Sequence, residues 1–374
     1  MSETPHNTIL TIPEPGTARL AERPYPKIIP GYALVEIAVA PVCNEAAIFE
    51  SHRFEWHDSP EHLGHEGVGT IVEVADGNRF DIGDRVLVFQ GDPCGHCFVC
   101  IEGLSPTHCL SIPYESFEGG FAPQDVPGGL LGIERATGSE SGGFGMARYR
   151  VAPERMMIRI PDELSFHYAA AGNCSVGANY SFAEEMDIKA GDVVLVAGVG
   201  FMGLGAIINA AYRNATVVAL GRNAFRMKLA RRCGADYVLN PEDPTWLDQL
   251  HAIAGDRKGA DIAIECSGAK MYIDACLQGL RRYGGLFTEG FVPGGETYPL
   301  NALTQLQDRH IRWTGGHDVR VRDREAMVRM LLDPTVQQHI DAMVTHTFPM
   351  SEAQEAFEIG LSKQCGKVYL LPQE

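Results

Sequence analysis

The stretch that decides half of the fold reads Val193-Val194-Leu195-Val196-Ala197-Gly198-Val199-Gly200-Phe201-Met202-Gly203. Its first five residues are apolar and mostly β-branched, which predicts a buried strand. The next six match G-x-G-x-x-G, where the glycines allow a tight turn, close approach of a pyrophosphate, and close packing of helix on strand. Because the motif follows a strand and opens a helix, it predicts a dinucleotide site formed by Gly198, Gly200, Phe201, Met202 and Gly203. The alternative is a glycine-rich turn used only for packing.

Around this motif, apolar strands alternate with amphipathic helices, as in a doubly wound parallel sheet. The expected strands are 193–197, 216–220, 261–266 and 285–289, and the expected helices are 204–212 and 224–233. We therefore assign residues 166–317 to a Rossmann-type dinucleotide-binding domain, within an α/β fold.

The chain up to about residue 160 is different, with short strands separated by turns. Residues 32–39 and 67–74 are expected strands, residues 83–88 are an expected turn that enters another strand, and residues 116–145 are expected to form a long surface loop. A helix at 324–332, and a further helix and final strand within 351–371, are expected to return to this part. The sequence therefore predicts a discontinuous β-rich domain formed by residues 1–165 and 318–374.

The end of the second strand, Leu220-Gly221-Arg222-Asn223, indicates the type of dinucleotide. An acidic residue here would bind the ribose hydroxyls of NAD. Gly221 instead leaves room for a 2′-phosphate, which Arg222 and Arg226 could bind through charge-assisted hydrogen bonds. NADP is therefore favoured; in the alternative, both arginines are solvated surface residues and NAD is used.

Four of the ten cysteines, Cys94, Cys97, Cys100 and Cys109, lie within sixteen residues. This spacing predicts a structural zinc site with four thiolates and no open position. His96 or His108 could replace one thiolate, although cysteine is the better candidate. Buried free thiols and disulfides are the alternatives.

A second candidate metal site consists of Cys43, His65, Glu66 and Cys174, which come from distant segments. Zinc binds thiolate, imidazole and carboxylate, and a catalytic site keeps a position for water or substrate. A single histidine can equally be structural, and Cys43 and Cys174 can be small buried apolar residues. The position of Cys174 before the nucleotide-binding strand favours the metal site.

Length, composition and charge limit the domain organisation and the classes of partner that we expect. The 374 residues exceed what one core usually serves, so two domains are expected. A net charge of −17 argues against nucleic acid or an anionic membrane as partner. With no bilayer-length apolar run and no signal-peptide character at the N-terminus, we expect a cytoplasmic protein with reduced thiols.

Together these motifs resemble those of the zinc-dependent medium-chain dehydrogenase/reductase superfamily, the alcohol and polyol dehydrogenases. The resemblance also includes Gly64-His65-Glu66-Gly67, Gly83-Asp84-Arg85-Val86 and Gly366-Lys367-Val368. It implies a GroES-like catalytic domain, a Rossmann domain and a homodimer or homotetramer. It further implies two zinc ions per chain, with Cys43, His65 and Cys174 as catalytic-site ligands and Glu66 as the carboxylate that approaches or replaces the water.

One segment departs from the family pattern. After the first ligand cysteine the family usually has Ser or Thr two residues on and often His five residues on, which carry the alcohol proton to solvent. Here these positions hold Glu45 and Ile48. Either Glu45 takes the proton, or another route operates and Glu45 makes only a structural hydrogen bond.

The resemblance implies reversible hydride transfer between an alcohol and NAD(P), and Glu45 weakly favours a polyol, sugar, cyclitol or amine-bearing substrate. A first alternative is a zinc lyase or dismutase that holds its cofactor tightly. A second is a non-catalytic zinc and dinucleotide-binding redox sensor.

Overall fold

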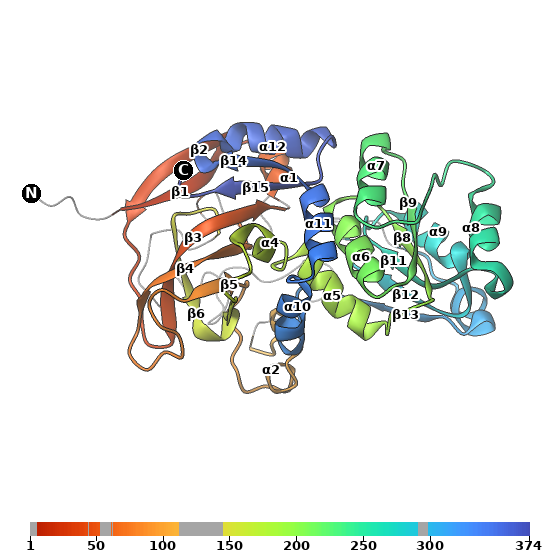
Figure 1. Cartoon of the computed structure of the whole chain (residues 1–374), viewed down its shortest axis with the longest axis horizontal. Coiled ribbons are helices and arrows are strands. Elements are labelled where there is room, and N and C mark those ends of the chain that lie inside the picture. Colours follow the sequence, from red (N-terminus) through yellow and green to blue (C-terminus); the bar gives the residue numbers. More distant parts are fainter. Residues whose placement is uncertain (1–5, 44, 53–60, 62, 112–144, 291–297) are drawn as a thin grey trace, which may run out of the picture. The chain divides into compact units, whose positions relative to one another are not determined.

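The computed structural model describes residues 6–43, 45–52, 61, 63–111, 145–290 and 298–374 (Figure 1). It divides into two compact units. The first comprises Met1–Asn173, Arg320–Leu332 and Val344–Glu374, and the second comprises Cys174–Val319 and Asp333–Met343. The loop expected at 116–145 lies outside the described residues, except for Gly145.

The first unit is built on a seven-stranded sheet in which β14, β15, β3, β4, β5 and β7 are neighbours in that order and β6 pairs with β3. All pairings in it are antiparallel except that of β14 with β15. A separate hairpin joins β1 (His6–Glu14) to β2 (Thr17–Pro24). The sheet strands are β3 (Tyr32–Val42), β4 (Gly67–Val74), β5 (Arg85–Val88), β6 (Tyr149–Pro153), β7 (Met157–Arg159), β14 (Val344–Pro349) and β15 (Lys367–Leu371).

Burial on one face of this sheet explains why these segments are strands. Val35, Ile37, Val86 and Val88 belong to one buried apolar cluster, together with residues of the C-terminal strand β15. Helices α1 (Glu45–Ser51) and α12 (Ala353–Ser362) pack against each other through Phe49 and Phe357, whose ring centroids are 5.2 Å apart. The C-terminal residues thus complete the core that the N-terminal strands begin. The unit also contains the short helices α2 (Phe98–Ile101), α4 (Phe166–Ala170) and α10 (Arg324–Met330).

The second unit contains a six-stranded sheet whose pairings are all parallel, in the order β10, β9, β8, β11, β12, β13. This is the 3-2-1-4-5-6 order of dinucleotide-binding sheets. With the β-rich first unit, it confirms the predicted α/β fold class. The strands are β8 (Val193–Ala197), β9 (Thr216–Leu220), β10 (Tyr237–Leu239), β11 (Ala260–Glu265), β12 (Leu280–Thr288) and β13 (Arg312–Gly315).

Helices cover both faces of this sheet, so β8 and β11 are buried along their whole length. α8 and α9 contribute Trp246, Leu250 and Tyr272 to the cluster on one face, while α6 packs on the sheet with α5, α7 and α11 beside it (Figure 1). The helices are α5 (Ser175–Glu185), α6 (Phe201–Tyr212), α7 (Ala224–Arg232), α8 (Trp246–Ala254), α9 (Lys270–Gly279) and α11 (Pro334–Met343).

One segment groups differently from its sequence assignment. Residues 318–374 were expected to join the first domain, but Asp333–Met343 groups with the second unit. The reason is packing: α11 contacts α6 and α7, and Cys233 Sγ lies 3.6 Å from the carbonyl oxygen of His339.

None of the described helices combines the length and apolarity that crossing a bilayer requires.

Candidate metal centres and dinucleotide site

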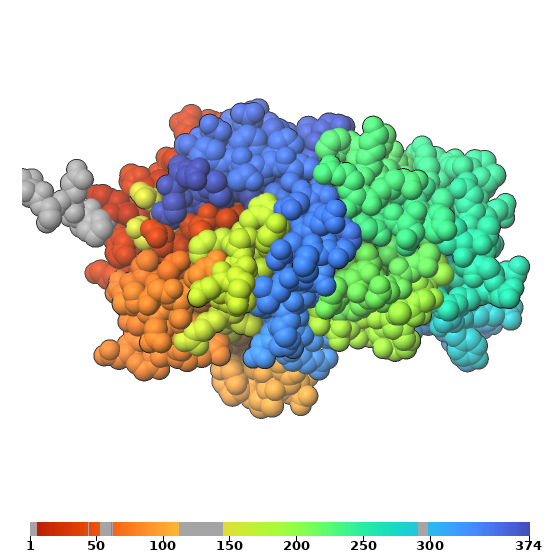
Figure 2. All heavy atoms as spheres, in the orientation of Figure 1, coloured from red at the N-terminus to blue at the C-terminus, as the bar shows by residue number. Residues whose placement is uncertain are grey.

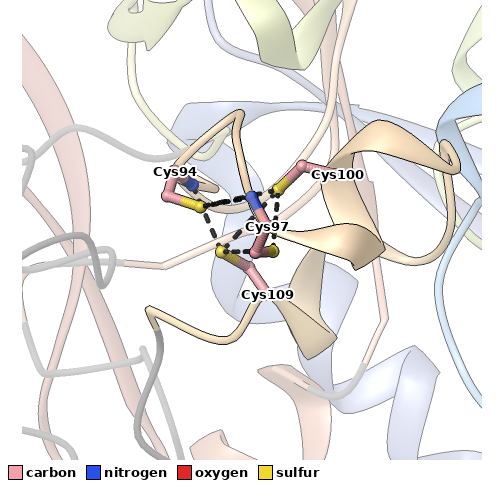
Figure 3. A group of neighbouring side chains, drawn as sticks. All are labelled: Cys94, Cys97, Cys100 and Cys109. Atoms are coloured by element: carbon pink, nitrogen blue, oxygen red, sulfur yellow. Dashed lines mark hydrogen bonds between the residues drawn. The ribbon is translucent and has the colours of Figure 1, made fainter.

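The four clustered cysteines of the first unit point their sulfur atoms at one another (Figure 3). The Sγ–Sγ distances are 3.5 Å for Cys97–Cys100, 3.8 Å for Cys100–Cys109, and 3.9 Å for both Cys94–Cys100 and Cys97–Cys109. Tetrahedral zinc with Zn–S bonds of about 2.3 Å places its sulfurs about 3.8 Å apart. The arrangement therefore fits zinc without rearrangement.

The four thiols differ in how readily they lose a proton. The Ser111 hydroxyl and the backbone N–H of His96 lower the pKa of Cys94 to about 5, whereas burial raises the pKa of Cys100 to about 12. A bound zinc ion would deprotonate a ligating thiol outright. His96 and His108 face other partners: His96 Nδ1 lies 3.0 Å from the Cys94 carbonyl oxygen, and His108 Nδ1 lies 3.3 Å from Thr107 Oγ1.

The lobe that carries these cysteines, residues 94–111, has little core of its own. Phe98, Ile101 and Leu110 are 59%, 71% and 65% exposed, so apolar burial cannot hold the lobe together. Backbone N–H groups of Val321 and Arg322 donate to carbonyl oxygens of the lobe and tie it to the rest of the unit. Figure 2 shows the lobe in light orange at the bottom of the view, next to a blue C-terminal segment. A zinc ion would replace the missing core as its organising element.

The second cluster groups Cys43, His65, Glu66 and Cys174, whose candidate ligand atoms all lie within 4.8 Å of one another. Cys43 follows β3, and His65 and Glu66 immediately precede β4. Cys174 follows Asn173, whose side chain accepts from Gly67 N at 3.1 Å and donates to Val88 O at 2.8 Å. All four sequence-predicted ligands are therefore brought together.

Glu45 contacts two members of this cluster, Cys43 and His65. Its side chain is fully buried; Oε2 accepts a hydrogen bond from Cys43 N at 2.7 Å, and Oε1 lies 3.2 Å from His65 Nδ1. Burial would raise the pKa of Glu45, but His65 and the N–H of Cys43 lower it to about 2. Burial would likewise lower the pKa of His65, yet Cys43 and Glu45 raise it well above its usual value.

Glu66 forms a buried ion pair that the residue pattern did not predict. Lys367 Nζ lies 2.5 Å from Glu66 Oε1, and the two side chains are 0% and 1% exposed. Glu66 Oε1 also lies 3.7 Å from His65 Nε2, so this ring nitrogen faces the cluster while Nδ1 faces Glu45. The other oxygen, Oε2, is buried and has no hydrogen-bond partner among the described residues.

The charges around this cluster fit a divalent cation. Arg150, only 2% exposed, donates to the carbonyl oxygens of His65 and Phe89, and its pKa falls to about 10 because of burial. Among the described groups, the buried cation Lys367 pairs with Glu66, and the thiols of Cys43 and Cys174 would ionise on metal binding. Zn²⁺ would satisfy the negative charge of these two thiolates and the unpartnered oxygen of Glu66.

The dinucleotide motif in the second unit has the predicted local structure. β8 ends at Ala197, and α6 begins at Phe201 with Gly200 as its N-cap and no side chain capping it. A Cβ at Gly203 would lie 1.9 Å from the carbonyl oxygen of Gly198, so only glycine allows this approach. An uncapped helix N-terminus after a glycine turn is suited to a pyrophosphate.

The end of β9 lacks the acidic residue that NAD enzymes use. A Cβ at Gly221 would lie 2.3 Å from Val199 Cγ2 and 2.8 Å from Met227 Sδ, so a larger side chain here would have to displace both of these side chains. Arg222 is exposed, and Arg226 extends back towards the motif, with Nη1 3.9 Å from the position of a Cβ on Gly200. Position 221 itself therefore carries no carboxylate, and the two guanidinium groups of Arg222 and Arg226 follow it in the chain.

A second buried carboxyl lies after β12. Glu289 Oε2 accepts from Asn179 Nδ2 at 3.1 Å, and the same amide group lies 3.2 Å from the carbonyl oxygen of Met202 in the dinucleotide motif. Burial raises the pKa of Glu289 to about 8. Burial therefore favours the protonated form of this carboxyl.

Lys367, Arg150 and Glu289 were not recognised as site residues from the sequence. The sequence did contain a signal for Lys367 and Arg150. Each is a charged residue next to apolar strand residues (Val368–Leu371 and Val151–Ala152), and a charge buried in such a strand requires a partner. Glu289 gave no comparable signal.

Comparison with known proteins agrees with this geometry. The family model of the alcohol dehydrogenase GroES-like domain matches residues 29–162, and that of zinc-binding dehydrogenases matches residues 202–333. The chain is 29% identical over 377 residues to erythritol/L-threitol dehydrogenase of Mycolicibacterium smegmatis, covering 96% of this chain and 95% of the relative. It is 28% identical over 382 residues to L-threonine 3-dehydrogenase of Pyrococcus furiosus, covering 99% of each.

Solved structures share the whole fold. Alcohol dehydrogenase TADH from Thermus sp. ATN1 superposes with a TM-score of 0.82 at 22% identity, covering 97% of this chain and 99% of that one. A zinc-binding dehydrogenase from Sinorhizobium meliloti, solved with NADP bound, gives a TM-score of 0.81 at 20% identity, covering 98% and 100%. At these identities the likeness demonstrates the fold.

Proposed function

The chain belongs to the zinc-dependent medium-chain alcohol and polyol dehydrogenase family, and we propose that it transfers hydride between a polyhydroxylated alcohol and NADP. We propose two zinc ions per chain, a catalytic one held by Cys43, His65 and Cys174 and a structural one in the lobe. The observation that carries the catalytic assignment is the convergence of these three side chains with the unpartnered buried oxygen of Glu66.

Each residue near the catalytic site has a distinct part. Glu45 Oε1 lies 3.2 Å from His65 Nδ1, so with zinc bound Nδ1 would carry the ring proton, and Nε2, which faces the cluster, would be free to bind the metal. Lys367 forms a buried ion pair with Glu66 and compensates its charge. When bound, zinc supplies Lewis-acid polarisation of the substrate oxygen, and the nicotinamide carries the hydride.

The position of Glu45 favours a positioning role over a proton-accepting one. Its side chain is 0% exposed, and both oxygens already face Cys43 N and His65 Nδ1. A relay group must exchange its proton with substrate and with solvent. The alcohol proton is therefore expected to leave by another route.

NADP is supported by the shape and charge at the end of β9. Gly221 supplies no acidic side chain to bind ribose hydroxyls, a larger side chain there would press on Val199 and Met227, and Arg222 and Arg226 can bind a 2′-phosphate. As the family resemblance implies, we expect a homodimer or homotetramer to be the working form.

The proposal is tested by steady-state kinetics with NADP and NAD against erythritol, threitol, sorbitol, cyclitols, L-threonine and simple alcohols. We expect turnover with NADP and the highest kcat/KM among the polyhydroxylated substrates. The matched pair is His65→Ala, which should lose activity, and Glu50→Gln on the exposed side of α1, which should retain it. Tight zinc and NADPH binding without turnover on any alcohol would support the sensor alternative instead. Cofactor that co-purifies and is not consumed would support the lyase or dismutase.

A further inference from the structure

Two oppositely charged side chains meet at the edge of the parallel sheet where the adenine-side ribose is expected. Arg222 Nη1 donates to Glu242 Oε1 at 3.2 Å, and the two side chains are 52% and 61% exposed. β9 and β10 are parallel neighbours in which Leu220 pairs with Leu239. Residues just beyond the ends of these two strands therefore emerge at the same edge of the sheet.

The position of Glu242 is set by its own loop, independently of the ion pair. The backbone N–H of Glu242 donates to Asn240 Oδ1 at 3.0 Å, which forms a side-chain-stabilised turn directly after β10. The N–H of Gly221 donates to the carbonyl oxygen of Leu239 at 3.0 Å and fixes the loop before Arg222 against the same strand. The backbone thus holds the carboxylate beside the guanidinium.

A phosphate and a carboxylate compete for the same guanidinium N–H groups, because both are recognised through the same charge-assisted hydrogen bonds. We propose that Glu242 is an internal competitor for the 2′-phosphate of NADP(H), pairing with Arg222 in the free protein and being displaced when the phosphate binds. Glu242 is then a specificity-determining residue that lowers the affinity for NADP relative to that for NAD. This inference rests on the proposed NADP site at Arg222 and Arg226.

The expected effect of Glu242 on NADPH affinity is moderate, because the Arg222–Glu242 ion pair is exposed. Exposed ion pairs contribute little, so removing the competitor should strengthen NADPH binding by about two- to five-fold. Repulsion between the Glu242 carboxylate and the phosphate acts in the same direction, and salt screens both effects. NADH carries a neutral hydroxyl in place of the phosphate, so its affinity should not change.

The test is a fluorescence titration of the zinc-loaded protein with NADPH and with NADH, at low and high salt. The variants are Glu242→Gln, Arg222→Gln and the double variant. Asp248→Asn on the exposed surface of α8 is the control, because it makes the same change in net charge. We expect Glu242→Gln alone to tighten NADPH by about two- to five-fold, with NADH unchanged, Asp248→Asn silent, and no gain when Arg222 is absent.

The inference would be overturned by equal effects on NADPH and NADH, by no effect on either, or by weaker NADPH binding, which would mean that Glu242 orients Arg222. A gain from Glu242→Gln that persists without Arg222 would overturn it too. If Arg222→Gln leaves NADPH affinity unchanged, the NADP site itself is wrong. If Arg222→Gln weakens NADPH but Glu242→Gln does nothing, only the competitor is wrong.

Discussion

Replacing Glu45 by Gln tests how His65 is held. The Glu45 carboxylate faces two donors, Cys43 N at 2.7 Å and His65 Nδ1 at 3.2 Å, in a fully buried site. A carboxylate can accept at both oxygens, whereas an amide has one accepting oxygen and one donating nitrogen. In either orientation of the introduced amide, therefore, one N–H group would face another N–H group.

The expected loss of zinc affinity follows from the tautomer of His65 that metal binding requires. His65 Nε2 faces Glu66 and must be unprotonated to bind zinc, so Nδ1 must carry the proton and have an acceptor. Loss of such a partner weakens metal affinity by about 10- to 100-fold. That corresponds to about 1.4–2.7 kcal/mol at this site, while the four-cysteine site should be unaffected.

The assay is zinc competition with a chromogenic chelator, read as two separate affinities per chain. Glu50→Gln, on the exposed side of the same helix, is the matched control and should bind zinc like the wild type. The reasoning is refuted if Glu45→Gln binds both zinc ions with wild-type affinity. A simultaneous loss of the acidic limb of the pH–rate profile would then identify Glu45 as the proton acceptor.

Three further predictions concern buried charge and the lobe. Lys367→Met leaves Glu66 buried without its cation, so urea unfolding of the zinc-free protein should show a loss of about 3–5 kcal/mol; equal stability would contradict the ion pair. The pKa of Glu289 is raised from 4.5 to about 8, so its stabilising contribution is complete below pH 4.5 and disappears as the pH rises to about 8. Glu289→Gln should therefore gain stability relative to wild type across that window, and parallel stability curves would refute this. Cys109→Ser should lose one zinc per chain and make the lobe protease-sensitive while NADPH binding persists; retention of two zinc ions would contradict the four-thiolate site.

Local sequence signals were sufficient for much of the fold. Val193–Ala197 and the glycine motif specify a strand, a turn and a helix through contacts between near neighbours, and the structure has all three. The helix begins at Phe201, three residues before the predicted start at Leu204, with Gly200 in the N-cap position. The assignment of α11 depended on packing against α6 and α7, which no local pattern encodes.

The residues of the candidate site likewise differ in whether nearby sequence was sufficient to predict their contacts. The lobe cysteines are close in sequence, so their spacing alone indicated a metal site. The pairing of Lys367 with Glu66 spans 301 residues and depends on β15 joining the sheet beside β3. Glu45 lay next to a predicted ligand, but which atoms it faces depends on how the turn before β4 packs. Its two possible roles could not be distinguished without the structure.

The central claim, a catalytic zinc site beside a structural one, is tested most directly by counting zinc per chain. Plasma mass spectrometry of the purified wild type and of His65→Ala, with protein quantified by amino-acid analysis, gives the stoichiometry. The account predicts two zinc ions in the wild type and one in His65→Ala, with the lobe zinc retained. One zinc ion per wild-type chain, unchanged in His65→Ala, would leave the lobe site standing and contradict the catalytic site.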